Sequence, residues 1–162
     1  MHIAVYAFDG ITMFHLSIPQ MVFGTVRQLG LADWWVSLFT TSSGTTALTE
    51  NTAAPETAVS AEAPTPPTHR EDPATLPSSL PALSIRTSEG YVLGGLGGPE
   101  LAREADVVVV PAWFADGRPA GGDLHSLLEG AHSRGACVVG LCLGAIPLAE
   151  AGLIGGRRAV TH

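Results

Sequence analysis

Short apolar runs alternate with amphipathic segments along this chain. Ile3 to Phe8 and Trp35 to Thr41 have the length and β-branched or aromatic content of strands, and Asp9-Gly10 provides a turn after the first of them. Between the two runs, Met13 to Leu29 has helical spacing. Its apolar stripe consists of Leu16, Val22, Phe23 and Val26. The N-terminal part therefore predicts a strand, a helix and a second strand.

The same alternation returns in the second half. Leu83 to Thr87 and Tyr91 to Leu93 predict a hairpin, and Gly94 to Gly98 predicts a flexible connection. The segments that follow predict a short helix over Pro99 to Glu104, a strand over Asp106 to Val110, a helix over Asp123 to Ser133, a strand over Ala136 to Leu141, a helix over Ala145 to Leu153, and the start of a strand over Arg158 to His162. The four consecutive valines indicate a strand covered on both faces, and the stripe Leu124, Leu127, Leu128 and Ala131 is the expected buried face of the longer helix.

Strands that alternate with helices of this length predict an α/β fold, a doubly wound parallel sheet with right-handed crossovers. In such sheets ligands bind beyond the carboxyl ends of the strands. The chain tips after Phe8, after Val110 and at Cys142 should therefore lie along one edge.

Residues 44 to 82 differ in composition from the rest. Seven of the twelve prolines lie between Pro55 and Pro81, among many Ala, Thr and Ser. Such a stretch buries too little apolar surface to offset the entropy of ordering it. We expect a mobile surface insertion within a single domain that spans residues 1 to 162.

Charge and hydropathy exclude several classes of protein. A net charge of -7 with only eight Lys and Arg predicts that this chain alone does not bind nucleic acid. The longest uncharged apolar run, Gly135 to Ala149, is too short and too Gly-rich to span a membrane, and no basic leader precedes the first strand. We expect a cytoplasmic protein. Gly94 to Gly98 lacks the context and the lysine of a phosphate-binding loop, and no cofactor is predicted.

The most informative segment is Gly140-Leu141-Cys142-Leu143-Gly144, which lies between a predicted strand and a predicted helix. Flanking glycines allow a sharp turn that holds the cysteine at the strand's carboxyl end, as in a nucleophile elbow. Amides at a helix start favour the thiolate and can hold an oxyanion. The alternative is a small buried structural cysteine. Cys137 lies about 16 Å away along the strand, too far for a disulfide, and is expected in the core.

A thiolate needs a proton-transferring partner and an oxyanion site. His15 and His162 are the histidines placed to approach Cys142, although each is equally compatible with a surface or core-edge role. The amides of Ala112 and Leu143 are the expected oxyanion donors. His125, Glu129 and His132 have metal-ligand spacing on one helical face, but that face is polar, so we expect a solvated surface and no metal site.

The order of several motifs resembles the DJ-1/PfpI superfamily, and most of all the N-terminal domains of AraC-type transcriptional regulators. The motifs are Phe8-Asp9-Gly10, Phe14 to Pro19, Val22-Phe23-Gly24, Arg86-Thr87-Ser88, Val108 to Pro111, Leu141 to Ala145, Ala151-Gly152-Leu153 and Gly156 to His162. The resemblance implies a flavodoxin-like, class I glutamine amidotransferase-like fold. It also implies that Cys142 is the reactive cysteine, that Leu143 supplies an amide next to it, and that His162 is the nearby histidine.

Three features depart from that pattern. His15 occupies the position where enzymatic relatives usually carry a carboxylate that assists proton transfer, and Pro111-Ala112 replaces a common Pro-Gly tip. Relatives also continue beyond the Thr161-His162 pair, and the regulators add a helix-turn-helix domain, so we expect a fold truncated at its C-terminus.

These features lead to three hypotheses. The first is a ligand- or redox-sensing domain of an AraC-type regulator with little or no catalysis, which takes a small-molecule effector and forms a homodimer. The second is a small cysteine-dependent enzyme of the same superfamily, of isocyanide hydratase or amidase type, in which Cys142 attacks and His15 or His162 moves the proton. The third is an inactive relative.

Overall fold

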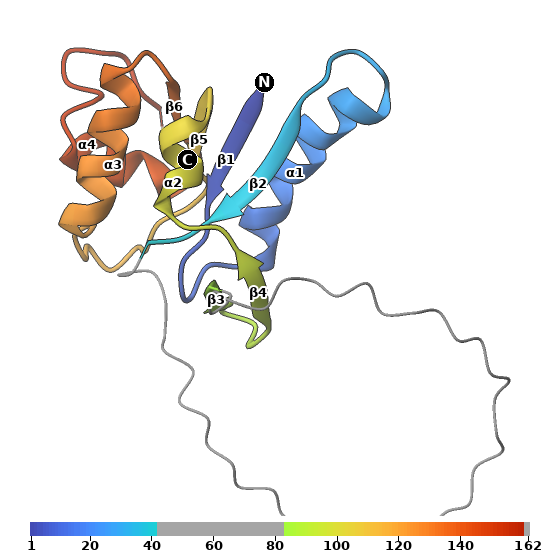
Figure 1. Cartoon of the computed structure of the whole chain (residues 1–162). Helices are drawn as coiled ribbons and strands as arrows, with labels where there is room; N and C mark the ends of the chain where they lie inside the picture. Colours follow the sequence, from blue (N-terminus) through green and yellow to red (C-terminus); the bar gives the residue numbers. More distant parts are fainter. Residues whose placement is uncertain (42–82, 161–162) are drawn as a thin grey trace, which may run out of the picture. The chain divides into compact units, whose positions relative to one another are not determined.

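The computed structural model describes residues 1–41 and 83–160, and a four-stranded parallel sheet lies at its centre (Figure 1). The strands are β1 (His2–Tyr6), β2 (Trp35–Phe39), β5 (Val107–Val110) and β6 (Cys137–Gly140), in the order β2-β1-β5-β6. Each neighbouring pair is parallel. The predicted α/β class and parallel sheet are therefore confirmed, whereas the predicted insertion at 44 to 82 lies outside the described residues.

Helices connect and flank these strands. They are α1 (Met13–Gln28), α2 (Pro99–Glu104), α3 (Gly122–Ser133) and α4 (Ala145–Glu150), and a short 3-10 helix, η2 (Cys142–Gly144), precedes the last of them. Figure 1 shows α1 beside β2 and, at the other side of the sheet, α3 with α4. No helix within the described ranges is both long and apolar enough to span a membrane.

The strand order reverses direction between β1 and β5. From β1 the chain first adds β2 on one side, and it later returns to place β5 and then β6 on the other side. This reversal leaves a crevice at the carboxyl ends of β1 and β5, which is where doubly wound sheets bind ligands.

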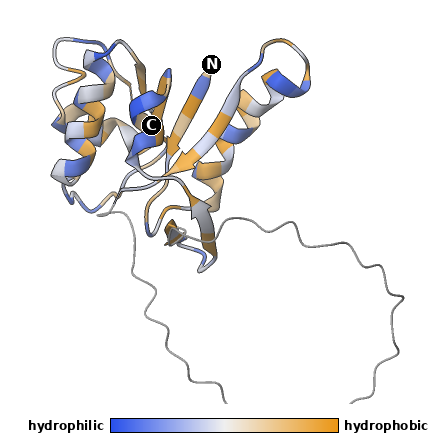
Figure 2. Ribbon diagram, viewed as in Figure 1, coloured by the Kyte–Doolittle hydropathy of each residue, from blue (hydrophilic) through white to orange (hydrophobic). Residues whose placement is uncertain are grey.

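The central strands and α3 form the core in the way the sequence predicts. All four valines of β5 are buried, because a strand in the middle of a parallel sheet is covered on both faces. Figure 2 shows hydrophobic residues along β1 and β2 in the same sheet. The buried residues of α3 are the predicted ones, namely Leu124, Leu127, Leu128 and Ala131.

The predicted face of α1 is partly wrong. Leu16 and Pro19 are its buried residues, and Phe23 packs partly against the core, but Val22 is 58% exposed. Successive helical residues are rotated by about 100°, so Pro19 and Phe23, three and seven positions after Leu16, lie on nearly the same side of the helix as Leu16. Val22, six positions after Leu16, points about 120° away from it.

The hairpin is confirmed, but its second strand is longer than predicted. β3 (Leu83–Arg86) pairs antiparallel with β4 (Val92–Leu96), so the glycine-rich segment 94–96 is strand and not a flexible connection. The reason is pairing with β3, in which Leu96 lies opposite Leu83 beyond an irregularity in the register. At the next residue, the Gly97 N–H donates to the Leu38 carbonyl (3.1 Å), and the Gly97 carbonyl accepts from the Thr40 amide (3.0 Å). These bonds tie the end of β4 to the end of β2.

Two predictions on the C-terminal side are wrong. Cys137 is exposed and does not lie in the core, because β6 is an edge strand of the described sheet. Arg158 to Val160 form no strand; instead, Ala159 and Val160 turn past α4 and line a groove beside Cys142. The last two residues of that predicted strand lie outside the described residues.

His2 makes the stability of the fold sensitive to pH. Its imidazole is buried, bonds Ser37 through Nε2 (2.6 Å) and stacks on Trp35. Burial lowers the pKa of His2, although nearby Asp106 acts in the opposite direction. Because the unfolded chain takes up a proton near pH 6.5 and the folded chain only at lower pH, we expect the free energy of unfolding to fall as the pH drops below about 6.5.

The check is chemical denaturation between pH 7.5 and 5.0 with wild type and His2→Gln. We expect the slope of stability against pH in this range to be smaller in the variant. His132→Gln, on the exposed end of α3, is the matched control and should keep the wild-type slope. Equal slopes in wild type and His2→Gln would contradict the assignment.

Candidate functional site

The backbone at Cys142 turns sharply between β6 and η2. Leu141 is still extended, and Cys142 then adopts a φ of 53°, which no other non-glycine residue of the described chain does in the positive range. A left-handed residue with a side chain costs free energy and persists only where the surrounding structure enforces it. The fold therefore holds this side chain exposed at the carboxyl end of β6.

Gly140 and Gly144 enforce the turn by close approach. A Cβ added at Gly140 would lie 2.7 Å from the carbonyl oxygen of Gly144, and one added at Gly144 would lie 2.0 Å from the carbonyl oxygen of Val110. That same Val110 carbonyl accepts the Leu141 amide at 2.9 Å. Both glycines are thus needed to pack η2 against β5 and β6.

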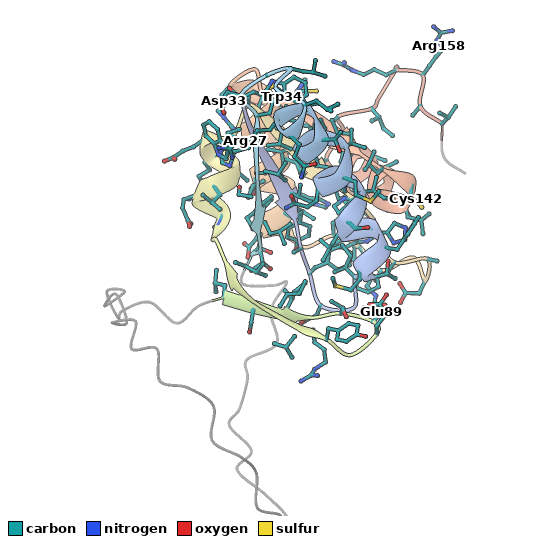
Figure 3. All side chains as sticks on the ribbon, turned by 90° about the vertical axis from the view of Figure 1, so that its right-hand side faces the viewer. Arg27, Asp33, Trp34, Glu89, Cys142 and Arg158 are labelled. Atoms are coloured by element: carbon teal, nitrogen blue, oxygen red, sulfur yellow. The ribbon has the colours of Figure 1, made fainter. Side chains whose placement is uncertain are left out.

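The exposed cysteine borders an apolar groove of about 310 Å³. Its lining residues are Cys142, Leu143, Ala145, Ile146, Ala149, Ile154, Ala159 and Val160. Figure 3 shows Cys142 at the rim of the fold, away from Arg27 and Trp34. None of these described lining residues is charged, so they favour an apolar ligand group next to the thiol.

Leu143 and Ala112, two of the predicted partners of Cys142, lie at the turn or beside it. Leu143 lines the groove, and the Ala112 amide lies 3.4 Å from where a Gly144 Cβ would be, so the tip after β5 adjoins the turn. His15 lies in the first turn of α1, where its Nδ1 bonds Thr12 Oγ1 (2.6 Å), and it is not among the lining residues of the groove, so its role as a partner of Cys142 stays a prediction. His162 lies outside the described residues.

Glu150, which the sequence analysis did not single out, links the helix after Cys142 to the loop after β5. Its carboxylate accepts the Ala120 amide (2.8 Å) and contacts His125 Nε2 (3.1 Å). The hydrogen bond from Ala120, with a smaller contribution from His125, lowers the pKa of Glu150. His125 is therefore a half-buried partner of α4 and not a purely solvated side chain as predicted. The part of the chain that the structure describes contains no metal-binding cluster of three or more His, Cys, Asp or Glu side chains.

A second cavity, about 340 Å³, lies at the tips of β1 and β5. Its residues are Tyr6, Phe8, Asp9, Trp113, Phe114, Arg118, Pro119 and Gly121. Neither Trp113 nor Phe114 was among the predicted site residues. The available signal was a pair of aromatic residues in the loop that follows a buried parallel strand, which is where side chains reach a ligand.

The fold is similar to one solved in a transcriptional regulator. A crystal structure of an AraC family transcriptional regulator from Pseudomonas putida superposes with a TM-score of 0.60 at 14% sequence identity. The match covers 96% of this chain, and this chain spans 63% of the length of that regulator. At this identity the likeness concerns the fold. No protein-family model and no curated protein matches the sequence.

Proposed function

We propose that this chain is the sensing domain of an AraC-type transcriptional regulator, with the flavodoxin-like fold of the DJ-1/PfpI superfamily. The observation that carries the proposal is the fold similarity to an AraC family regulator, which extends over 96% of the chain. The motif order around Cys142 and the strand order that reverses at β1 and β5 support it.

In this proposal Cys142 reports on a ligand or an oxidant and does not turn over substrate. Its side chain is exposed beside an apolar groove, as a sensing thiol requires. His15 stands where the enzymatic relatives carry a proton-transferring carboxylate, and it is engaged with Thr12. An imidazole in place of that acid changes the protons available next to the thiol, which weakens the case for hydrolysis or hydration.

The test of the regulatory role is a deletion of the gene in its host, followed by transcript analysis. We expect a small set of transcripts to change and to be restored by the wild-type gene. Unchanged transcripts would contradict the proposal. The enzyme alternative would gain if the purified chain converted isocyanides, amides or 2-oxoaldehydes at ordinary enzyme rates and lost this activity on Cys142→Ser.

Thiol labelling tests the exposure on which the sensing role depends. Since both cysteines are exposed, we expect the native protein to take up two iodoacetamide adducts, and Cys142→Ser and Cys137→Ser to take up one each. Intact-mass spectrometry without denaturant gives the number of adducts. A Cys137→Ser protein that reacts only after unfolding would show that Cys142 is sealed from solvent. Labelling of Cys142 that persists well below about pH 8 would instead favour the enzyme alternative.

A further inference from the structure

Strand β6 leaves one side of the sheet unpaired. It is the outermost strand on the side opposite β2, and no strand of the described residues pairs with its other edge (Figure 1). The amides of Cys137 and Leu141 donate to backbone carbonyls on the β5 side, both at 2.9 Å. Because backbone N–H and C=O groups alternate in direction along a strand, those of Val138 and Gly140 point away from β5. β6 therefore presents hydrogen-bond donors and acceptors at a free edge.

This free edge lacks charge, proline and bulges, the features that usually protect edge strands. Residues 135–149, which include β6, contain no Asp, Glu, Lys or Arg, and β6 itself contains no proline. The register of β6 with β5 is continuous over the whole strand. The turn at Cys142 leads away from the edge, since Gly144 packs against the Val110 carbonyl on the β5 side. The edge is thus open to a further strand.

The opposite edge of the sheet is partly covered. β2 is outermost there, and the Leu38 carbonyl accepts the Gly97 amide (3.1 Å) while the Thr40 amide donates to the Gly97 carbonyl (3.0 Å). The end of the hairpin therefore occupies hydrogen-bonding positions on the outer side of β2. With β6 as the open edge of the described sheet, pairing through it closes after two copies and does not continue into a fibre.

Two apolar grooves adjoin the β6 edge. One is the groove beside Cys142, and the other, about 280 Å³, contains Val138; Ile154 lines both. His132 and Arg157 are the basic side chains of the second groove, and they lie beside the start of β6. Antiparallel pairing of two β6 strands places the start of one strand beside the end of the other, so it separates these basic groups, whereas parallel pairing would bring them together.

We propose that β6 pairs antiparallel with β6 of a second copy of this chain and joins two sheets into one. The occupant is a second copy because such an edge is complementary to itself under a two-fold axis. A net charge of -7 makes two copies repel each other, and the uncharged segment 135–149 is where they approach with the least repulsion. The axis passes beside Val139, so that Val138 of each copy exchanges hydrogen bonds with Gly140 of the other, about four in all. This inference is independent of the proposed sensing function.

The first test measures the mass of the full chain by sedimentation velocity over a series of micromolar concentrations. We expect wild type to sediment as a dimer. Val138→Pro removes an outward amide and leaves the bonds to β5 in place, as an edge position allows. Each dimer loses about half of its inter-chain hydrogen bonds in this variant, so we expect the dimer to weaken at least about tenfold. Circular dichroism checks that the variant is folded.

Val36→Pro is the matched control on the other edge of the sheet. The Trp35 amide donates to the Met1 carbonyl on the β1 side (3.1 Å), so the amide of Val36 points outward, as that of Val138 does. Both valine side chains are half-buried, and the two substitutions make the same chemical change. We expect Val36→Pro to keep the wild-type dimer.

A disulfide cross-link tests the register. In a chain that also carries Cys137→Ser and Cys142→Ser, Val139→Cys places two thiols opposite each other with Cα atoms about 4.5 Å apart, within the range of a disulfide. We expect diamide to convert this protein into a covalent dimer on a non-reducing gel. The control is Cys142→Ser alone, which keeps the exposed Cys137 on the same strand. The proposed register sets Cys137 opposite Leu141 of the other copy, so this control should cross-link much more slowly.

Other results would overturn the proposal. They are a wild type that is monomeric at every concentration, species larger than dimers, and equal cross-linking of Val139→Cys and the Cys142→Ser control. A dimer that survives Val138→Pro but dissociates in Met21→Lys would place the interface on α1, where Met21 is 68% exposed. If Val138→Pro does not fold, the cross-linking comparison still decides.

Discussion

Gly144→Ala is expected to lower the free energy of unfolding by about 3 kcal/mol. The added methyl group would lie 2.0 Å from the carbonyl oxygen and 2.9 Å from the carbonyl carbon of Val110. Both atoms belong to the backbone of β5, a buried strand inside the sheet, so neither can move aside without disturbing β1 and β6. Urea denaturation followed by circular dichroism gives the value.

Gly130→Ala is the matched control for this substitution. Gly130 lies within α3, and a Cβ added there meets no atom within 4 Å. Alanine is the better helix former, so we expect this variant to gain up to about 1 kcal/mol. A Gly144→Ala protein with a denaturation midpoint at or above that of wild type would show that η2 does not pack against Val110 as described.

Phe39→Ala is expected to cost about 3 to 5 kcal/mol. Phe39 ends β2, is fully buried and packs with its ring 5.4 Å from that of Tyr6. Its truncation leaves a cavity beneath the end of the hairpin, because Gly97 bridges to this residue. Thermal and urea denaturation measure the loss.

Phe14→Ala makes the same chemical change at a position that is 67% exposed, on the first turn of α1. We expect its stability to remain within about 0.5 kcal/mol of wild type. Equal losses in Phe14→Ala and Phe39→Ala would mean that burial does not distinguish the two rings, and would contradict the described packing of β2.

The elements of this fold were predictable where the apolar pattern of the sequence matches a face that the fold buries completely. The valines of β5 and the stripe of α3 are examples, since one run is apolar throughout and the other repeats at helical spacing. Cys137 was mispredicted because alternation along a strand shows which residues share a face, but not whether anything covers that face. The extension of β4 through Gly94 and Gly95 was missed because it depends on an irregular register with β3, in which Leu96 lies opposite Leu83, and local composition does not report that pairing.

The two candidate sites differ in how far apart their residues lie in the sequence. Gly140, Cys142 and Gly144 are close in sequence, so their spacing alone indicated a sharp turn that presents a side chain. The structure adds that the turn places Cys142 itself at a φ of 53°. The aromatic cavity combines Phe8 and Asp9 with Trp113 and Arg118, more than a hundred residues away. No local pattern connects those segments until β1 and β5 pair.

The amino-acid order was sufficient to establish the alternation of strands and helices, the parallel sheet and the exposed turn at Cys142, because each depends on backbone preferences and apolar periodicity over a few residues. The folded arrangement alone decided that β1 and β5 lie side by side with the strand order reversing between them, that Glu150 holds the loop after β5, and that Asp9 and Arg118 face one cavity. The reason is physical: pairing between distant strands is set by the burial of the whole sheet, and the contacts it creates leave no regular spacing along the chain.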